Sequence, residues 1–104
     1  MDYTIITVPD LNDSVSRVVL DGVAYQIRFT YNMLGDYWKF SLLDSLGNAI
    51  IQGVKIVPNF PLNLFAGGAE LPLGVFAALT KLDRIGRKDF AEDKAKFIYC
   101  PVVQ

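Results

Sequence analysis

Hydrophobic and polar residues alternate along much of the chain, which is the pattern of half-buried β-strands. The alternation is clearest in residues 14–20 and 23–32, which an Asp-Gly pair at 21–22 separates. Asp-Gly between apolar runs favours a two-residue type I′ turn, because Asp tolerates and Gly readily accepts the positive φ angles of this turn. The sequence therefore predicts a β-hairpin in which Leu20 faces Val23.

The position of this turn also fixes which residues of the hairpin are buried. Counting outward places Val18 opposite Tyr25 and Ser16 opposite Ile27. A slip of one residue would expose the aromatic side chains and bury the arginines, so burial and turn chemistry select the same register. The residues that share the apolar face are Leu20, Val18, Val23, Tyr25, Ile27, Phe29 and Tyr31.

Two further turns continue the same arrangement. Residues 32–36 predict a turn before a strand at 37–43, and residues 44–48 suit a type I turn closed by a glycine bulge. Residues 49–57 then return as a strand in which Gly53 marks a bulge or a close approach of two backbones. We expect four consecutive strands to be antiparallel neighbours.

The ends of the chain predict shorter or less regular elements. Residues 3–8 form a short β-rich run that ends before Pro9 and is expected at a sheet edge. Residues 75–79 suit a strand or a short helix. Residues 95–102 predict a last strand, which Pro101 marks as ending or lying at an edge.

Two long segments between these strands have opposite character. Residues 60–76 carry one charge and several Pro and Gly residues, which predicts a long apolar loop with room for one helical turn at 62–65. In residues 81–96, ten of the sixteen residues are charged with mixed signs, which is typical of a solvated excursion. The apolar loop must either cap the core or present a hydrophobic surface to another protein.

Together these elements predict an all-β fold. Six or seven short strands with frequent turns indicate a small antiparallel barrel or sandwich, and we favour a partly closed barrel with one long apolar loop. The length of 104 residues fits one β domain that spans residues 1–104.

The amino-acid composition excludes several classes of binding and catalytic site. Ten Lys plus Arg and eleven Asp plus Glu give a net charge of −1, so we expect no nucleic-acid specificity. The absence of His excludes His-based catalytic and zinc sites. The lone Cys100 lies in an apolar run and is interpreted as a small buried hydrophobe. We expect no metal, no cofactor, no membrane span and no signal peptide, and therefore synthesis in the cytoplasm.

Acidic and basic clusters have structural interpretations. Asp21, Asp36 and Asp44 lie at hairpin corners, so we assign them turn roles rather than a catalytic pair, and the acids of 83–93 lack the spacing of an EF-hand loop. The basic cluster of Arg84, Arg87 and Lys88 lies among acids, which favours an intrachain or interface ion pair over phosphate binding.

Several stretches, taken in order, resemble a known family. They are residues 21–29, 38–48, 71–74, 86–90 and 97–99, which include the Asp-Gly hairpin, a Trp strand followed by Asp-x-x-Gly, and an aromatic final strand. This set is similar to the small phage tail proteins typified by the cyanophage baseplate plug, over nearly the whole chain.

The resemblance implies a structural, non-enzymatic role in the virion. Such a protein would sit at the hub of a contractile tail baseplate and close the tail tube, with hub, spike or tail-tube proteins as partners and self-association left open. The partner interface that we expect comprises Phe60, Leu62, Leu64, Phe65, Leu71, Leu73, Phe76, Arg84, Arg87, Lys88 and Asp89.

Two other classes of function compete with this one. The first is a small β adaptor that binds a peptide or partner along an exposed edge strand such as residues 3–8. The second is a small enzyme that uses carboxylates and tyrosines, which requires two inward-facing carboxylates in a deep pocket.

Overall fold

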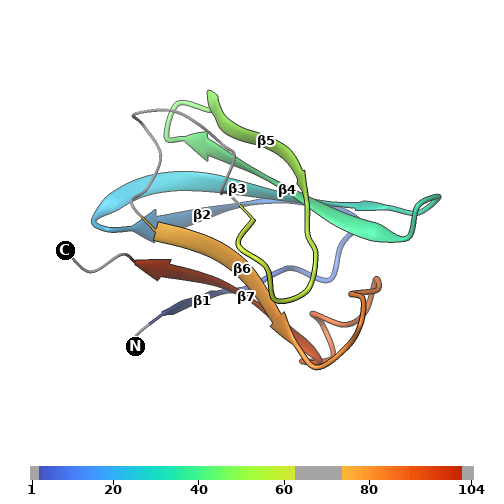
Figure 1. Ribbon diagram of the computed structural model, residues 1–104. Coiled ribbons are helices and arrows are strands. Elements are labelled where there is room, and N and C mark those ends of the chain that lie inside the picture. Colours follow the sequence, from blue (N-terminus) through green and yellow to red (C-terminus); the bar gives the residue numbers. More distant parts are fainter. Residues whose placement is uncertain (1–2, 63–73, 102–104) are drawn as a thin grey trace.

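The computed structural model describes residues 3–62 and 74–101, which form an all-β structure (Figure 1). The strands are β1 (Thr4–Ile6), β2 (Asp13–Leu20), β3 (Val23–Asn32), β4 (Tyr37–Asp44), β5 (Ala49–Lys55), β6 (Gly74–Thr80) and β7 (Ala95–Pro101). They build a four-stranded sheet of order β2-β3-β4-β5 and a three-stranded sheet of order β1-β7-β6, both antiparallel. The predicted all-β class is confirmed. The preferred partly closed barrel is not, because the strands form two separate sheets.

The β2–β3 hairpin has the predicted turn and register. Asp21 and Gly22 have φ angles of 52° and 80°, as a type I′ turn requires. Leu20 pairs with Val23, and every pair of the two strands follows from there as expected. Val23 differs from the prediction in its burial. It is 51% exposed, because it directly follows the turn at the end of the sheet.

The next two connections also follow the sequence pattern. In the β4–β5 turn the Gly47 N–H donates to the Asp44 carbonyl at 3.0 Å, and Gly47 has a φ of 89°. The register of β4 against β5 shifts beside Gly53, which has a φ of 58° and donates its N–H to Ser41 Oγ at 2.9 Å. Gly53 therefore marks a bulge, which was one of its two predicted roles.

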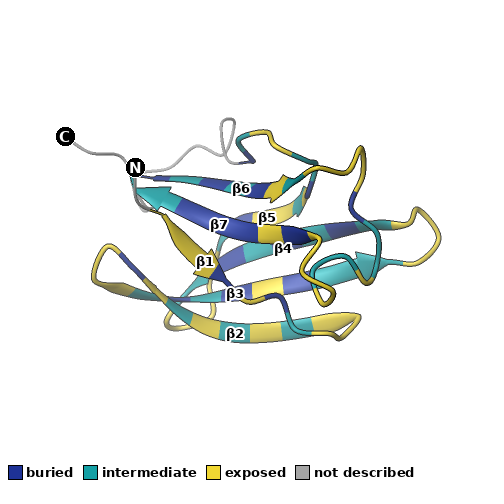
Figure 2. Cartoon of the chain, turned by 90° about the horizontal axis from the view of Figure 1, so that it is seen from below, coloured by how far each residue is buried: buried dark blue, intermediate teal, exposed yellow. Residues whose placement is uncertain are grey.

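Aromatic rings from the two sheets meet in a common core. Figure 2 shows buried residues on strands of both sheets. Phe97 of the three-stranded sheet packs edge-on against Phe29 and Phe40 of the other, with ring centroids 5.0 and 5.1 Å apart. The largest fully buried side chains are Trp38, Tyr99, Phe29, Phe40, Phe76, Phe97, Leu20, Ile27, Leu42 and Ile51.

Residues 56–62 cross from one sheet to the other. The Ile56 N–H donates to the Trp38 carbonyl on β4, and the N–H groups of Asn59 and Leu62 donate to carbonyls of β6, each at 2.8 Å. These hydrogen bonds join the two sheets along one side of the core.

The β1-β7-β6 sheet tests what the sequence predicts for residues 3–8, 75–79 and 95–102. β1 lies at the edge, as predicted, and residues 75–79 form part of a strand. β7 lies between β1 and β6, so Pro101 ends the strand and does not mark an edge. Cys100 is only partly buried.

The segment between β6 and β7 is not simply a solvated excursion. Ile85 is 4% exposed, and Trp38 Nε1–H donates to the Gly86 carbonyl at 3.1 Å. The Phe90 ring packs edge-on against Trp38 at 5.9 Å between centroids. These apolar anchors dock the charged segment on the core. Over residues 3–62 and 74–101 the structure contains no helix long and apolar enough to cross a membrane.

Candidate functional site

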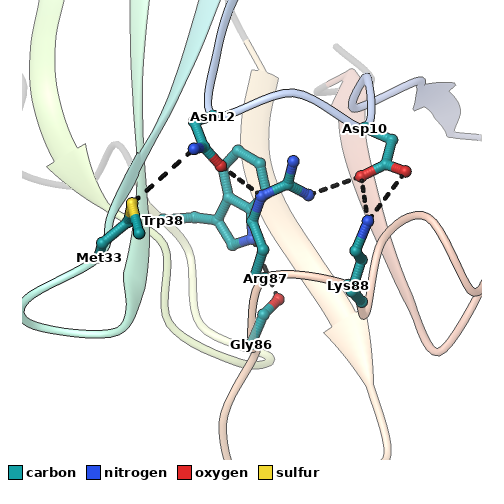
Figure 3. A network of polar contacts seen from close by, with 7 residues as sticks. All are labelled: Asp10, Asn12, Met33, Trp38, Gly86, Arg87 and Lys88. Atoms are coloured by element: carbon teal, nitrogen blue, oxygen red, sulfur yellow. Dashed lines mark hydrogen bonds and ion pairs between the residues drawn. The ribbon is translucent and has the colours of Figure 1, made fainter.

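The charged residues between β6 and β7 form a polar network with the loop that precedes β2 (Figure 3). Arg87 Nη1 lies 2.7 Å from Asp10 Oδ1, and Lys88 Nζ lies 3.1 Å from the same oxygen. Arg87 Nε–H also donates to Asn12 Oδ1 at 2.6 Å. Two cations therefore hold one carboxylate and connect two segments that are far apart in the sequence.

Trp38 positions Arg87 within this network. The guanidinium carbon lies 5.5 Å from the centre of the Trp38 ring, and Trp38 itself is 1% exposed. The Arg87 side chain is 23% exposed. On the far side Asn12 Nδ2–H donates to Met33 Sδ at 3.8 Å. Arg87 thus lies against the core, and its charged end reaches the surface.

At neutral pH the negative charge of Asp10 faces the positive charges of Arg87 and Lys88. Hydrogen bonds from Arg87 and Lys88 hold the pKa of Asp10 below its ordinary value. The carboxylate is therefore ionised at neutral pH, where both cations are charged. We call Asp10, Asn12, Arg87 and Lys88 the charged rim.

Arg84 makes a second, more exposed contact nearby. Its Nη2 donates to the Asp36 carbonyl at 2.7 Å and forms an ion pair with the Asp36 carboxylate, which also accepts from the Tyr31 hydroxyl. The Arg84 side chain is 62% exposed. Arg84, Arg87 and Lys88 thus all form intrachain ion pairs, one of the two arrangements that the sequence predicts.

Asp89 closes its own loop. Its Oδ2 accepts from the Gly86 N–H at 2.6 Å, and its carbonyl accepts from the Lys94 N–H at 2.8 Å. Within this chain, Asp89 therefore shapes the segment that carries the neighbouring cations.

Of the apolar residues predicted at the interface, some lie on the surface of the structure and others lie in its core. Phe60 is 51% exposed, whereas Leu62 is 8% and Phe76 0% exposed. Leu62 and Phe76 belong to the core of the chain itself, because their side chains pack in the aromatic cluster. Leu64, Phe65, Leu71 and Leu73 lie outside the described residues.

The side of the three-stranded sheet that faces away from the core is largely apolar, which is not predicted from the sequence above. Phe97 and Tyr99 point into the core, so the residues between them and beside them on β7 point outward, as do their partners on β6 and β1. Ile5 and Leu79 are 54% and 37% exposed. The outward-facing residues, which we call the outer face, are Ile5, Val75, Ala77, Leu79, Ile98, Cys100 and Lys96, and of these Ile98 is only 6% exposed.

The outer face differs from an ordinary solvated sheet face. Antiparallel sheets commonly alternate between apolar residues that face the core and polar residues that face water. Consecutive apolar residues at 97–100 are the sequence signal for a strand that is apolar on both sides. Beside the outer face lies a hollow of about 540 Å³, lined by Leu79 and Leu82, with three lysines and one acid, Asp93, around them. The combination of apolar floor and basic border is suited to protein contact.

The candidate catalytic acids are used in turns. Asp21 and Asp36 have φ angles of 52° and 56° at hairpin corners. The Asp44 carboxylate accepts the N–H groups of Asn48 and Leu46 at 2.8 and 2.9 Å, and these bonds lower its pKa. The turn roles predicted for these three acids are therefore confirmed. In the described ranges, no group of three Cys, Asp or Glu residues is placed to hold a metal ion.

Comparison with known proteins adds one match. A family model described as the cyanophage baseplate Pam3 plug gp18 matches residues 1–101, which include both sheets, the charged rim and the outer face. No curated protein matches the chain.

Proposed function

The chain belongs to the cyanophage baseplate plug family, and from this premise we propose that it closes the tail tube at the hub of a phage baseplate. The family is a structural one, and the match over residues 1–101 is the observation that carries the proposal. The protein acts by occupying space and docking on neighbouring subunits, without catalysing a reaction. It is made in the host cytoplasm and assembled into the virion tail.

The outer face supports this role as a docking surface. Ile5 and Leu79 expose apolar side chains on a sheet whose other face is already filled by the aromatic core. Burying them against a hub, spike or tail-tube protein would gain roughly 25 cal/mol for each Å² of apolar surface removed from water. Phe60 adds a further exposed aromatic ring.

The charged residues suit the border of the same interface. Arg84 and Lys88 are exposed and paired with Asp36 and Asp10 in the isolated chain. Exposed ion pairs contribute little to stability, so these cations can exchange their partners for carboxylates of a neighbouring subunit at low cost. Such border charges select the partner and orient docking.

An assembly experiment tests the role. In a phage that encodes this chain, we expect deletion of the gene to give tails that lack the plug and release the genome early. Leu79→Glu should fold but be depleted from purified tails, because a charge on the outer face opposes burial. The matched control is Leu46→Glu, at an exposed position in the β4–β5 turn. Normal, closed tails without the protein would contradict the proposal.

An edge-strand adaptor is the alternative function that one observation favours. A groove of about 330 Å³ lies between β1 and β2 and is lined by Ile5, Pro9 and Val18 among others. A peptide could lie along β1 there. Purification separates the two functions, since an adaptor would be recovered with a soluble partner and a plug with tail particles.

A further inference from the structure

β2 is an open sheet edge that lacks several of the features that usually protect one, although it carries the charged residues Asp13 and Arg17. In the described part of the chain it pairs with β3 alone, and its register is unbroken from Asp13 to Leu20. It contains no Pro, no Lys and no bulge, and Val15 and Val19 are 57% and 61% exposed. Soluble proteins usually block such an edge, because its free main-chain groups attract another strand.

The hydrogen-bond pattern shows which residues of β2 present those groups. The Tyr31 N–H donates to the Asn12 carbonyl at 2.8 Å, so Asn12 forms a hydrogen-bonded pair with β3. Pairs alternate along an antiparallel ladder, so the even-numbered residues of β2 bond to β3. Asp13, Val15 and Arg17 therefore direct their N–H and C=O groups toward the open edge.

We propose that β2 pairs antiparallel with β2 of a second copy of this chain, about a two-fold axis at Val15. This register places Asp13 of each copy opposite Arg17 of the other. Arg17 makes no ion pair with any described residue of its own chain. The two-fold repeats each contact, so one interface contains two such pairs.

Charge opposes the two-fold registers in which the axis lies at either of the next outward-bonding residues, Asp13 or Arg17, because like charges would then face each other. With the axis at Arg17, two guanidinium groups would lie directly opposite each other, which destabilises a strand pair. With the axis at Val15, the Asp13 carboxylate lies between Arg17 of the second copy and Arg28 of its own chain, which it already contacts at 2.6 Å. Two valines then meet at the centre.

The inner face of β2 agrees with the same register. Ser14 Oγ is buried and has no hydrogen-bond partner among the described residues. An axis at Val15 places Ser16 of the second copy opposite Ser14, where two hydroxyl groups can bond across the strands. A buried hydroxyl without a hydrogen-bond partner destabilises the single chain, and a hydrogen bond from the second copy would remove this destabilisation.

Self-association should be measured on the purified full chain by sedimentation equilibrium over a wide range of concentration. We expect a monomer–dimer equilibrium. Val15→Lys should raise the dissociation constant by about tenfold or more, because two ammonium groups would meet on the axis. The matched control, Val23→Lys, changes a similarly exposed valine on β3 and should leave the constant within about twofold. Thermal melting confirms that both variants fold.

Disulfide crosslinking tests the register. Under mild oxidation Val15→Cys should give a covalent dimer, because strand partners at the axis have Cα atoms about 5.5 Å apart. Val19→Cys lies opposite a different residue and should stay uncrosslinked, as should the parent chain with Cys100 alone. A dimer crosslinked through Arg17→Cys instead would overturn the Val15 axis.

The proposal does not depend on the role in the baseplate, and the two can fail separately. A wild-type chain that stays monomeric at every concentration overturns self-pairing, as does a dimer that Val15→Lys leaves intact. If the chain is monomeric yet Val15→Lys is lost from purified tails, the β2 edge receives a strand from another baseplate protein, and self-pairing is wrong.

Discussion

Tyr99 on β7 donates its phenolic proton to the carboxylate of Asp21 in the β2–β3 turn, with 2.5 Å between the two oxygens. The Tyr99 side chain is 1% exposed, and Asp21 is held in the turn at a φ of 52°. This bond connects residues 78 positions apart and joins the two sheets at the hairpin end. It shows how one turn residue serves both the local conformation and the packing of the sheets.

Replacing Tyr99 by Phe should lower the free energy of unfolding by about 1–2 kcal/mol, because a buried hydrogen bond to a charged group is lost. Denaturant unfolding measures the change. Tyr3→Phe is the control, since Tyr3 is 46% exposed at the start of the chain and should change the free energy by less than about 0.5 kcal/mol. Equal losses in the two variants would contradict the role of the Tyr99–Asp21 bond.

The same tyrosine predicts a loss of stability in alkali. Burial, followed by the hydrogen bond to Asp21, raises the pKa of Tyr99 well above its ordinary value of 10.0. Above that pH the unfolded chain releases the phenolic proton while the folded chain retains it, so stability falls as pH rises. We expect this fall to be shallower in Tyr99→Phe, measured by unfolding across a pH series. An unchanged slope would show that Tyr99 does not cause it.

Gly74→Ala should destabilise the chain by about 1–3 kcal/mol through overpacking. A Cβ at Gly74 would lie 2.5 Å from the Cys100 carbonyl oxygen and would overlap the Tyr99 ring. The backbone oxygen cannot move without disturbing β7, so the clash is not relieved by a rotamer change. Gly86→Ala is the control, because its nearest neighbour, Asp89 Oδ2, would lie at 3.4 Å. Thermal unfolding of both variants compares the two costs.

Arg87→Lys should cost about 1 kcal/mol, although the charge is kept. A lysine cannot bond to Asp10 and Asn12 with one planar group, nor lie over Trp38 in the same way. Arg84→Lys should cost less than about 0.5 kcal/mol, because that side chain is 62% exposed. Denaturant unfolding would contradict this prediction if the two variants were equally destabilised.

Local signals account for the parts of the fold that could be predicted from the sequence. The Asp-Gly turn and the alternation beside it determine the β2–β3 register, because turn geometry and burial act on neighbouring residues. The bulge at Gly53 and the turn at Asp44 follow for the same reason. Asp89 is predicted at the interface, and its hydrogen bond from the Gly86 N–H shows that it also closes a local loop.

Contacts between distant segments could not be predicted in this way. Arg87 and Asp10 are 77 residues apart, and nothing in their own surroundings selects this pair from the other charges of the chain. Likewise, alternation cannot decide whether two sheets remain separate or close into a barrel, since both bury one face of each strand. The apolar outer face did leave a signal at residues 97–100, where the expected polar positions are missing.

The charged rim predicts a specific acid sensitivity. Hydrogen bonds from Arg87 and Lys88 hold the pKa of Asp10 below its ordinary value of 3.8, so its contribution to stability is present above that pH and is lost as pH falls through the lower, folded pKa. Asp10→Asn lacks this contribution at every pH. We therefore expect wild type to be more stable than Asp10→Asn at neutral pH and the difference to shrink as the medium is acidified below the ordinary pKa. Asp83→Asn is the control, at an exposed position of the segment between β6 and β7. A difference that stays constant across the acid series would mean that the Asp10 ion pairs do not stabilise the fold.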